Sequence, residues 1–172
     1  EIPMQKMGIQ TTFIANPINI DKVEYSPLKI EDKINIFLGI NRLSYLNKGI
    51  PFFEKALAII KEKYPKKVDI IITENIPYKE YISIYNEAHI LLDQVYAYDQ
   101  GYNALEAMAK GKVVFTGAET EFLKLYHLNE NEVNINALPD VNDIVEKLSL
   151  LIENPYLILE ISKNAKAFIE KE

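Results

Sequence analysis

Residues 100–112 decide the fold, and they read Gln-Gly-Tyr-Asn-Ala-Leu-Glu-Ala-Met-Ala-Lys-Gly-Lys. The apolar run 89–92 precedes them across a polar loop, and the apolar run 113–116 follows directly. This order predicts a strand, a loop, a helix over 102–110 and a second strand, with Gly101 at the start of the helix and Gly111 just past its end. A strand, a helix and a strand in succession are typical of a parallel sheet.

The start of this predicted helix is a candidate anion site. A helix that begins after a glycine at the carboxyl end of a strand presents unpaired N–H groups and a partial positive charge, which suit a phosphate. Glu106 lies about one turn into the helix, where its carboxylate can accept hydrogen bonds from sugar hydroxyls. A diphosphate next to a ribose would satisfy both features. Each feature alone has an ordinary explanation, because Gly101 can simply turn the chain and Glu106 can be a solvated helix residue.

Strand-like and helical patterns alternate along the rest of the chain. Strands are predicted at 11–15, 34–39, 68–73, 89–93, 112–116 and 133–136. Helices are predicted at 51–64, 78–87, 102–110, 119–126, 140–153 and 155–169. Pro51 suits a first helical turn, and Asp140 and Asn154 are expected to act as N-caps. This alternation predicts a Rossmann-like three-layer α/β fold, a parallel sheet with helices on both faces whose ligands bind at the carboxyl ends of the strands.

Composition excludes several kinds of site. The chain has 172 residues, 19 of them basic and 25 acidic, and no dense basic patch points to nucleic acid. It has no cysteine for a disulfide, a thiolate nucleophile or a zinc–thiolate site, and we expect His89, one of only two histidines, to be structural. The apolar runs are too short to span a membrane, and no signal peptide is visible. The size fits one domain, and the lack of an initiator methionine suggests a fragment or a processed product.

The loop after the strand at 34–39 carries two cations, Arg42 and Lys48. Arginine can bind a phosphate through a bidentate fork, and lysine adds a point charge. One arginine and one lysine in a surface loop are usually just solvated. Here they follow the carboxyl end of a strand and so share the ligand side of the sheet with Gly101 and Glu106. Together these features predict a site for a phosphate and a sugar.

These motifs also resemble those of a known family. Residues 39–49 contain Gly-Ile-Asn-Arg-Leu and Asn-Lys-Gly, residues 78–92 read Tyr-Lys-Glu-Tyr-Ile-Ser-Ile-Tyr-Asn-Glu-Ala-His-Ile-Leu-Leu, and residues 105–114 read Leu-Glu-Ala-Met-Ala-Lys-Gly-Lys-Val-Val. In this order and spacing, the chain from Phe13 to Phe168 resembles the C-terminal, donor-binding half of GT-B glycosyltransferases. The retaining enzymes of glycosyltransferase family 4 have the most similar pattern. Asn-Pro-Ile-Asn at 16–19 is similar to the segment that opens that domain.

The resemblance implies a role for each matching residue. Arg42 and Lys48 match the basic pair that binds the donor's diphosphate, and Glu106 matches the second glutamate of a paired motif that holds the nucleotide ribose. The loop whose N–H groups meet the phosphate is matched by Gly101, Tyr102 and Asn103.

The chain departs from the family pattern at two places. Tyr98 replaces the first glutamate of the pair, with Asp99 one residue away, and the usual Pro-Ser after the strand at 89–93 is Asp93-Gln94. A phenol can form a hydrogen bond with a sugar hydroxyl but carries no charge at neutral pH, and Asp99 could reach the same hydroxyl if the loop shifts. We therefore place Tyr98 and Asp99 among the donor-binding residues and leave the sugar unassigned.

The resemblance implies transfer of a sugar from a nucleotide diphosphate sugar to an acceptor, with retention of configuration. The two cations and the helix N-terminus would stabilise the departing diphosphate in place of a metal ion, so we expect no metal and no cofactor beyond the donor substrate. Residues 1–172 would form one nucleotide-sugar-binding domain. A missing N-terminal domain would bind a glycan or a lipid-linked acceptor, so this chain alone would be weakly active or inactive. The resemblance further implies glycan biosynthesis in the cytoplasm, where the missing domain could hold the protein at the inner face of a membrane.

Two other classes of protein stay open. One is a non-catalytic sugar-nucleotide or glycan-binding module that kept the fold and lost turnover, which the change at Tyr98 permits. The other is a flavodoxin-like or receiver-like signalling domain. That class is disfavoured, because the chain lacks an acidic cluster after the first strand and a lysine after the last one.

Overall fold

The computed structural model describes residues 7, 8, 10 and 16–172, and its centre is a five-stranded parallel sheet. The strands are β1 (Ile34–Ile40), β2 (Val68–Glu74), β3 (Ile90–Leu92), β4 (Val113–Thr116) and β5 (Ile135–Asn136). Their order across the sheet is β2-β1-β3-β4-β5, and every neighbouring pair is parallel. These strands confirm the predictions from residue 34 onward, whereas the predicted strand at 11–15 lies outside the described residues.

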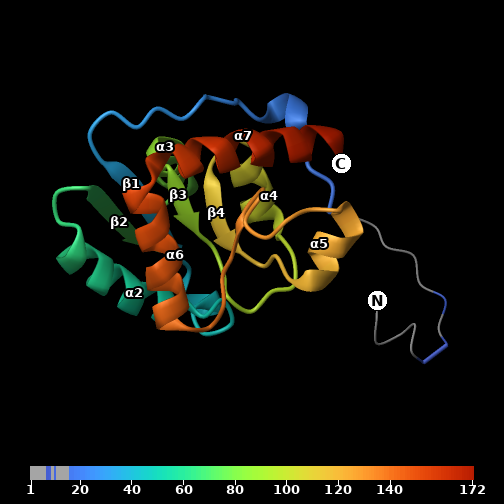
Figure 1. Cartoon of the computed structure of the whole chain (residues 1–172), viewed down its shortest axis with the longest axis horizontal. Helices are drawn as coiled ribbons and strands as arrows, with labels where there is room; N and C mark the ends of the chain where they lie inside the picture. The colour runs from blue at the N-terminus through green and yellow to red at the C-terminus, as the bar shows by residue number, and fades with distance from the viewer. Residues whose placement is uncertain (1–6, 9, 11–15) are drawn as a thin grey trace.

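Helices follow the strands as the alternation predicts. They are α2 (Ile50–Lys63), α3 (Tyr78–Glu87), α4 (Tyr102–Ala109), α5 (Thr120–Tyr126), α6 (Val141–Glu153) and α7 (Pro155–Lys171). Among the described residues, the 3-10 helix η1 (Ile20–Lys22) precedes β1, and the 3-10 helix η2 (Arg42–Ser44) lies between β1 and α2. Figure 1 shows α2 and α6 packed together beside the sheet and α7 running across the top of the molecule. The predicted Rossmann-like α/β fold is therefore confirmed. Within the described residues, no helix is both long and apolar enough to cross a membrane.

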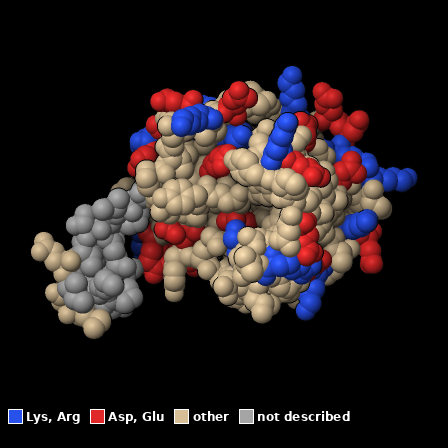
Figure 2. Space-filling view, turned by 180° about the vertical axis from the view of Figure 1, so that it is seen from behind, with Lys and Arg blue, Asp and Glu red and all other residues tan. Residues whose placement is uncertain are grey.

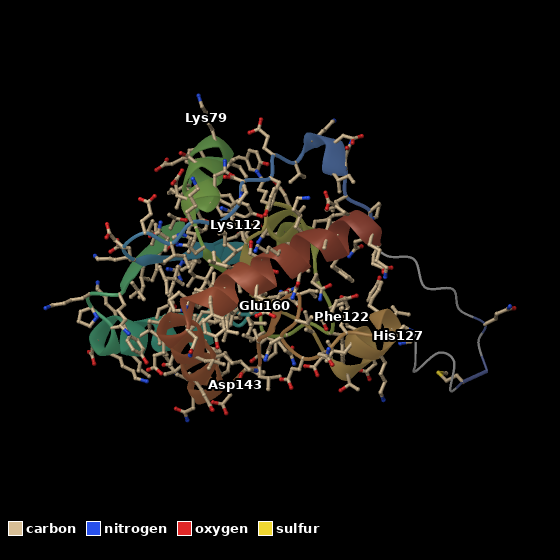
Figure 3. The ribbon with its side chains drawn as sticks, turned by 45° about the horizontal axis from the view of Figure 1, so that its top comes forward. Lys79, Lys112, Phe122, His127, Asp143 and Glu160 are labelled. Atoms are coloured by element: carbon tan, nitrogen blue, oxygen red, sulfur yellow. The ribbon has the colours of Figure 1, made fainter. Side chains whose placement is uncertain are left out.

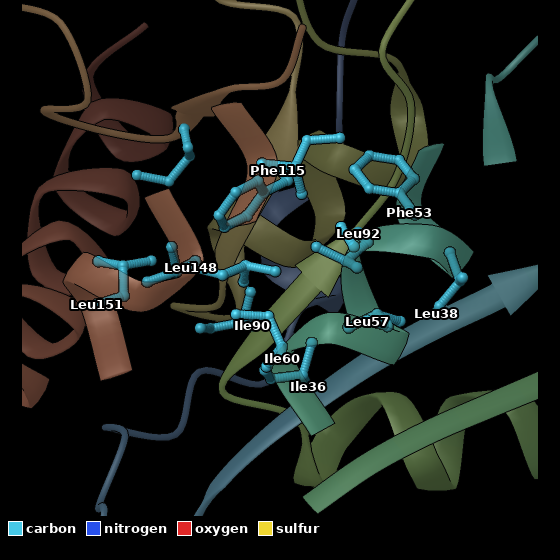
Figure 4. Close-up of a cluster of buried hydrophobic side chains, with 14 of the residues drawn as sticks. Ile36, Leu38, Phe53, Leu57, Ile60, Ile90, Leu92, Phe115, Leu148 and Leu151 are labelled. Carbon is cyan, nitrogen blue, oxygen red and sulfur yellow. The ribbon is translucent and has the colours of Figure 1, made fainter. Parts of the chain in front are cut away.

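Two apolar cores lie on the two faces of the sheet. On one face, Ile36 and Phe115 pack with the buried stripes of α2 and α6, as Figure 4 shows. On the other face, Phe37 and Leu91 pack with α3, α4 and α5. Successive side chains of a strand point to opposite faces, so a strand buried on both faces needs a continuous apolar run, and β1 reads Ile-Asn-Ile-Phe-Leu-Gly-Ile.

Helix α7 contributes to both cores. Ile158 and Ile161 in its first half belong to the core with α2 and α6, and Ala165 in its second half belongs to the core with α4 and α5. Between them, Ser162 donates a hydrogen bond of 2.5 Å to the carbonyl of Gly111, just past the end of α4. One helix therefore connects the two layers.

Both predicted N-cap positions are confirmed, but only one of the two side chains makes a capping hydrogen bond. Asp140 caps α6, because its carboxylate accepts hydrogen bonds from the N–H groups of Asn142 and Asp143. Asn154 occupies the N-cap position of α7 as predicted, but its side chain makes no bond to that helix and instead donates to the carbonyl of Leu150 at 2.9 Å. Asn154 is the single residue between α6 and α7, so its amide satisfies a carbonyl in the last turn of α6.

His89 has a structural role at the amino end of β3. Its Nδ1 accepts a hydrogen bond from the Asn35 N–H at 2.8 Å, and its Nε2 lies 2.9 Å from the Lys29 carbonyl, which assigns the ring as the neutral Nε2–H tautomer. Burial lowers the pKa of His89, and the positive charge of Lys112, labelled in Figure 3, lowers it further. The hydrogen bond to the Lys29 carbonyl raises the pKa but does not outweigh these two effects. Protonation would cost the bond from Asn35.

This environment makes stability depend on pH. The unfolded chain binds a proton at His89 near the ordinary pKa of 6.5, whereas the folded chain binds it at lower pH. The unfolded state therefore holds more protons in that range, and the free energy of unfolding should fall as the pH drops below 6.5. In urea titrations, the stability difference between the wild type and His89→Asn should shrink from pH 7.5 to pH 5. A difference that stays constant over this range would contradict the assignment.

Candidate functional site

The candidate site lies at the carboxyl ends of the strands, where the loops after β1 and β3 meet. The Val95 N–H donates to the Lys48 carbonyl at 3.0 Å, which joins the two loops. Gly49 has a φ of 68°, and a Cβ at this position would lie 2.2 Å from a methyl carbon of Val95. Only glycine allows this close approach, so the Asn-Lys-Gly motif fixes where Lys48 leaves the backbone.

A buried carboxylate connects Lys48 with the start of α4. Oδ1 of Asp93 lies 2.7 Å from Nζ of Lys48 and also accepts a hydrogen bond of 3.0 Å from Nδ2 of Asn103. The Asp93 side chain is 2% exposed, whereas that of Lys48 is 33% exposed. The ammonium therefore reaches from the surface to a carboxylate beneath it, close to the first turn of α4.

Further hydrogen bonds hold this cluster in place. The Tyr81 hydroxyl donates to Oδ1 of Asn103 at 3.0 Å, so the other end of the Asn103 amide must face Asp93. The Tyr85 hydroxyl donates to the Asn103 carbonyl, and the Thr116 hydroxyl lies 3.4 Å from Oδ2 of Asp93. Burial, together with the negative charge of Asp93, raises the pKa of Tyr81 to about 12. Tyr81 consequently stays a donor at neutral pH.

The Arg42 side chain points toward β2, whereas Lys48 points toward β3 on the opposite side of β1. Its guanidinium forms a salt bridge of 2.5 Å with Glu74 at the end of β2, and it stacks over the Tyr45 ring at 4.7 Å. The hydrogen bond from Arg42 lowers the pKa of Glu74. Both side chains are nearly half exposed. The structure thus brings Lys48 to α4 and leaves Arg42 paired at β2, so a shared contact of the two cations with one ligand stays a prediction.

Gly101 and Tyr102 lie at the start of α4 as predicted, and Glu106 lies about one turn further along the helix. Gly101 is the N-cap residue and makes no side-chain cap, which leaves the first N–H groups of the helix without a side-chain acceptor at this position. Tyr102 is 60% exposed. The Glu106 side chain is 38% exposed, and its nearest cation is Lys110, at 4.0 Å. This loose pairing leaves the Glu106 carboxylate accessible.

The predicted pair Tyr98 and Asp99 lies on the loop between β3 and α4. Both are exposed, and the Tyr98 carbonyl accepts a hydrogen bond from the Glu119 N–H. The buried Gln100 side chain donates to the Gly117 carbonyl at 2.7 Å. A cavity of about 450 Å³ is lined in part by Asp99 and Gln100, between residues 16–20 and the end of α7. This hollow adjoins Asp99, whereas Lys48 is not among its lining residues.

Close backbone contact with Gly117 sets the position of this loop. A Cβ at Gly117 would lie 2.4 Å from the Ala97 carbonyl oxygen and 2.7 Å from the Asp99 nitrogen. Gly117→Ala should therefore displace the loop and lower the free energy of unfolding by about 1–3 kcal/mol. At Gly101 the nearest atom would lie 3.7 Å away, so Gly101→Ala should cost less. Chemical denaturation of both variants tests this, and equal stabilities would contradict it.

Sequence reasoning missed Asp93 and Glu74 as parts of the site. Asp93 directly follows β3, and Glu74 is the last residue of β2, so both acids lie at the carboxyl ends of strands that face the site. Asp93 comes immediately after the buried run Ile90–Leu92, and a charge at such a position needs a partner. That signal could have paired Asp93 with Lys48. The pairing of Glu74 with Arg42 had no comparable signal, because both side chains are exposed.

The face of the molecule seen in Figure 2 carries charges of both signs. Figure 2 shows acidic and basic side chains intermixed on the face opposite to the view of Figure 1. Across the part of the chain that the structure describes, no group of three or more histidine, cysteine or acidic side chains is placed to hold a metal ion.

Comparison with known proteins identifies the family. A family model described as "Glycosyl transferase-like" matches residues 44–172, which is more than half of the chain and includes Lys48, Asp93 and all of α4. The chain belongs to this glycosyl transferase-like family. No curated protein matches the sequence.

Solved structures of glycosyltransferases share the fold. The C-terminal domain of a glycosyl transferase group 1 family protein, LpcC from Francisella tularensis, is 19% identical with a TM-score of 0.65 over 91% of this chain and 98% of that one. Sucrose-phosphate synthase from Thermosynechococcus elongatus is 18% identical with a TM-score of 0.68 over 99% of this chain and 51% of that one. HepE from Anabaena, in complex with UDP and glucose, is 16% identical with a TM-score of 0.67 over 99% and 56%. The glycosyl transferase-like chain therefore has the fold of a GT-B C-terminal domain and spans about half the length of the last two proteins.

Proposed function

We propose that this chain is the donor-binding domain of a glycosyltransferase that moves a sugar from a nucleotide diphosphate sugar to an acceptor with retention of configuration. The observation that carries the proposal is the placement of Lys48. Its ammonium lies 2.7 Å from Asp93, which also accepts a hydrogen bond from Asn103 in the first turn of α4. A partly exposed cation and a helix N-terminus thus lie together at the carboxyl end of the sheet, in a chain of the glycosyl transferase-like family.

This arrangement suits the charge that develops in sugar transfer. When the glycosidic bond breaks, the leaving diphosphate gains negative charge. The Lys48 ammonium and the N–H groups at Gly101, Tyr102 and Asn103 would oppose that charge, and one such donor can stabilise a transition state by about 3 kcal/mol. Arg42 would join them by exchanging Glu74 for a phosphate, which its exposed position allows. These groups provide the positive charge that a metal ion provides in other transferases.

The remaining predicted residues would bind the sugars of the donor. Glu106 is accessible one turn into α4 and would accept hydrogen bonds from the ribose hydroxyls. Tyr98 and Asp99 would face the transferred sugar from the loop after β3. The solved structures support a ligand of this class, because HepE was crystallised with UDP-glucose and TarM from S. aureus with UDP. Those proteins are about twice or more the length matched here, so we assign the acceptor, a glycan or lipid-linked molecule, to a further domain.

The direct test is a thermal-shift titration of this chain with UDP, GDP and their sugars, with and without Mg²⁺. Because the positive charge comes from side chains and N–H groups, UDP or GDP should raise the melting temperature, and Mg²⁺ should add little. Stabilisation that appears only with the divalent ion would contradict the metal-free site. The absence of any shift would contradict the proposed function.

Matched variants separate the phosphate contacts from the ribose contacts. Lys48→Gln and Arg42→Gln should each lower the affinity for nucleoside diphosphate by about 2 kcal/mol and leave the affinity for the nucleoside unchanged, since a charged hydrogen bond needs the phosphate. Glu106→Ala should lower both affinities alike, by about 1–3 kcal/mol, because both ligands carry the ribose. Calorimetric titration measures each constant. Equal losses of affinity for the two ligands in the Lys48 and Arg42 variants would mean that these residues do not contact the diphosphate.

A second candidate is a non-catalytic module that binds a sugar nucleotide or a glycan. The observation that favours it is Tyr98, a 76% exposed phenol at the position where the resemblance places a glutamate. Under this hypothesis the chain binds the donor, but the full-length protein transfers no sugar. Measuring donor consumption by the full-length protein and by its Tyr98→Glu variant distinguishes the transferase from the non-catalytic module. The substitution should create activity only in a module that had lost it.

A further inference from the structure

We infer that Asp93 is a positioning residue for the donor's diphosphate, which it affects through Lys48. This inference rests on the proposed function and adds to it a residue that lies outside the basic pair and the glutamate. The observation behind it is a carboxylate that is 2% exposed, sits at the end of a central strand and pairs with a 33% exposed lysine.

Hydrogen bonds from several segments hold Asp93 in place. Its backbone N–H donates to the Phe115 carbonyl at 3.0 Å, which holds it beside β4. Its Oδ1 accepts from Lys48 and Asn103, and its Oδ2 lies 3.4 Å from the Thr116 hydroxyl. Asn103 in turn is oriented by the Tyr81 hydroxyl. A buried carboxylate with hydrogen-bond partners on both oxygens is held rigidly in one position.

The bond to Asp93 in turn restricts the Lys48 side chain. A lysine side chain has a flexible stem of four carbons, and it loses about 2 kcal/mol of rotamer entropy when it is held in one conformation. The bond to Asp93 holds the ammonium near the first turn of α4 before any ligand arrives. An ammonium has three N–H donors, and among the described residues Asp93 is the one hydrogen-bond acceptor of Nζ. Two donors are left for a phosphate while the bond to Asp93 persists.

Asp93 has two opposing electrostatic effects on a bound phosphate. The Asp93 charge also repels a bound phosphate, and this effect opposes the gain from holding Lys48. The lysine lies between the two anions, because it is the more exposed partner and its ammonium reaches inward to Asp93. Opposite charges are then in contact on both sides, whereas the two anions are separated by the ammonium. The structure therefore favours a net gain from Asp93.

The test is a double-mutant cycle of Asp93→Asn, Lys48→Gln and the double variant. Asparagine can still accept from Asn103 and donate to the Thr116 hydroxyl, and the double variant replaces an ion pair with a neutral hydrogen-bonded pair, so each protein should fold. Affinities are measured by calorimetry with UDP and GDP, each beside its nucleoside. Asp69→Asn is the matched control, because it removes an exposed pair with Lys33 near the amino end of β2.

The positioning role predicts a specific pattern. Asp93→Asn should weaken binding of the nucleoside diphosphate on the order of tenfold and leave nucleoside binding unchanged. Adding Asp93→Asn to Lys48→Gln should cause no further loss, and Asp69→Asn should bind like the wild type. Unchanged or tighter diphosphate binding by Asp93→Asn would overturn the inference, as would an equal loss for the nucleoside or a full additional loss in the double variant. In those cases wild-type binding keeps the proposed function intact, whereas a wild type that binds neither diphosphate overturns both.

Discussion

The contact between the Lys48 ammonium and the buried Asp93 carboxylate is the constraint on which the site depends. A carboxylate at the end of a central strand is costly unless it is paired and hydrogen-bonded. Its partners come from the loop after β1, the first turn of α4 and the end of β4. The same bonds that compensate one buried charge therefore hold three separate segments in register, and the backbone bond from Val95 to Lys48 adds to them.

The geometry of a parallel sheet makes this convergence possible. Strands β1, β3 and β4 are neighbours in the sheet, so the loops at their carboxyl ends are neighbours too. Two glycines allow close contacts that a Cβ would block. Gly49 lets the loop after β1 approach Val95, and Gly117 lets the backbone of residues 97–99 lie against the end of β4. The chemistry of the site thus depends on backbone contacts that tolerate no Cβ.

The elements of the fold could be predicted from the sequence because hydrophobic periodicity and capping signals are local. The strand Ile34–Ile40, the helix Val141–Glu153 and the cap at Asp140 all follow from neighbouring residues. The position of Asn154 at the start of α7 could be predicted too, but the partner of its amide could not, because two helix ends compete for one side chain. The placement of Lys48 at α4 followed from the topology, whereas the pairing of Arg42 with Glu74 depends on two exposed side chains from different strands, which no local pattern encodes.

Helix α7 has a consequence for how the molecule comes apart. Its first half is buried with α2 and α6 and its second half with α4 and α5, while Ser162 anchors the middle to the end of α4. Detaching the helix would expose apolar surface on both sides of the sheet at once, so neither layer can melt alone without losing part of its own core. Partial opening is thereby penalised, and we expect the two layers to unfold as one cooperative unit. The loops that carry Lys48 and Asp93 would then lose their support only when the whole domain unfolds.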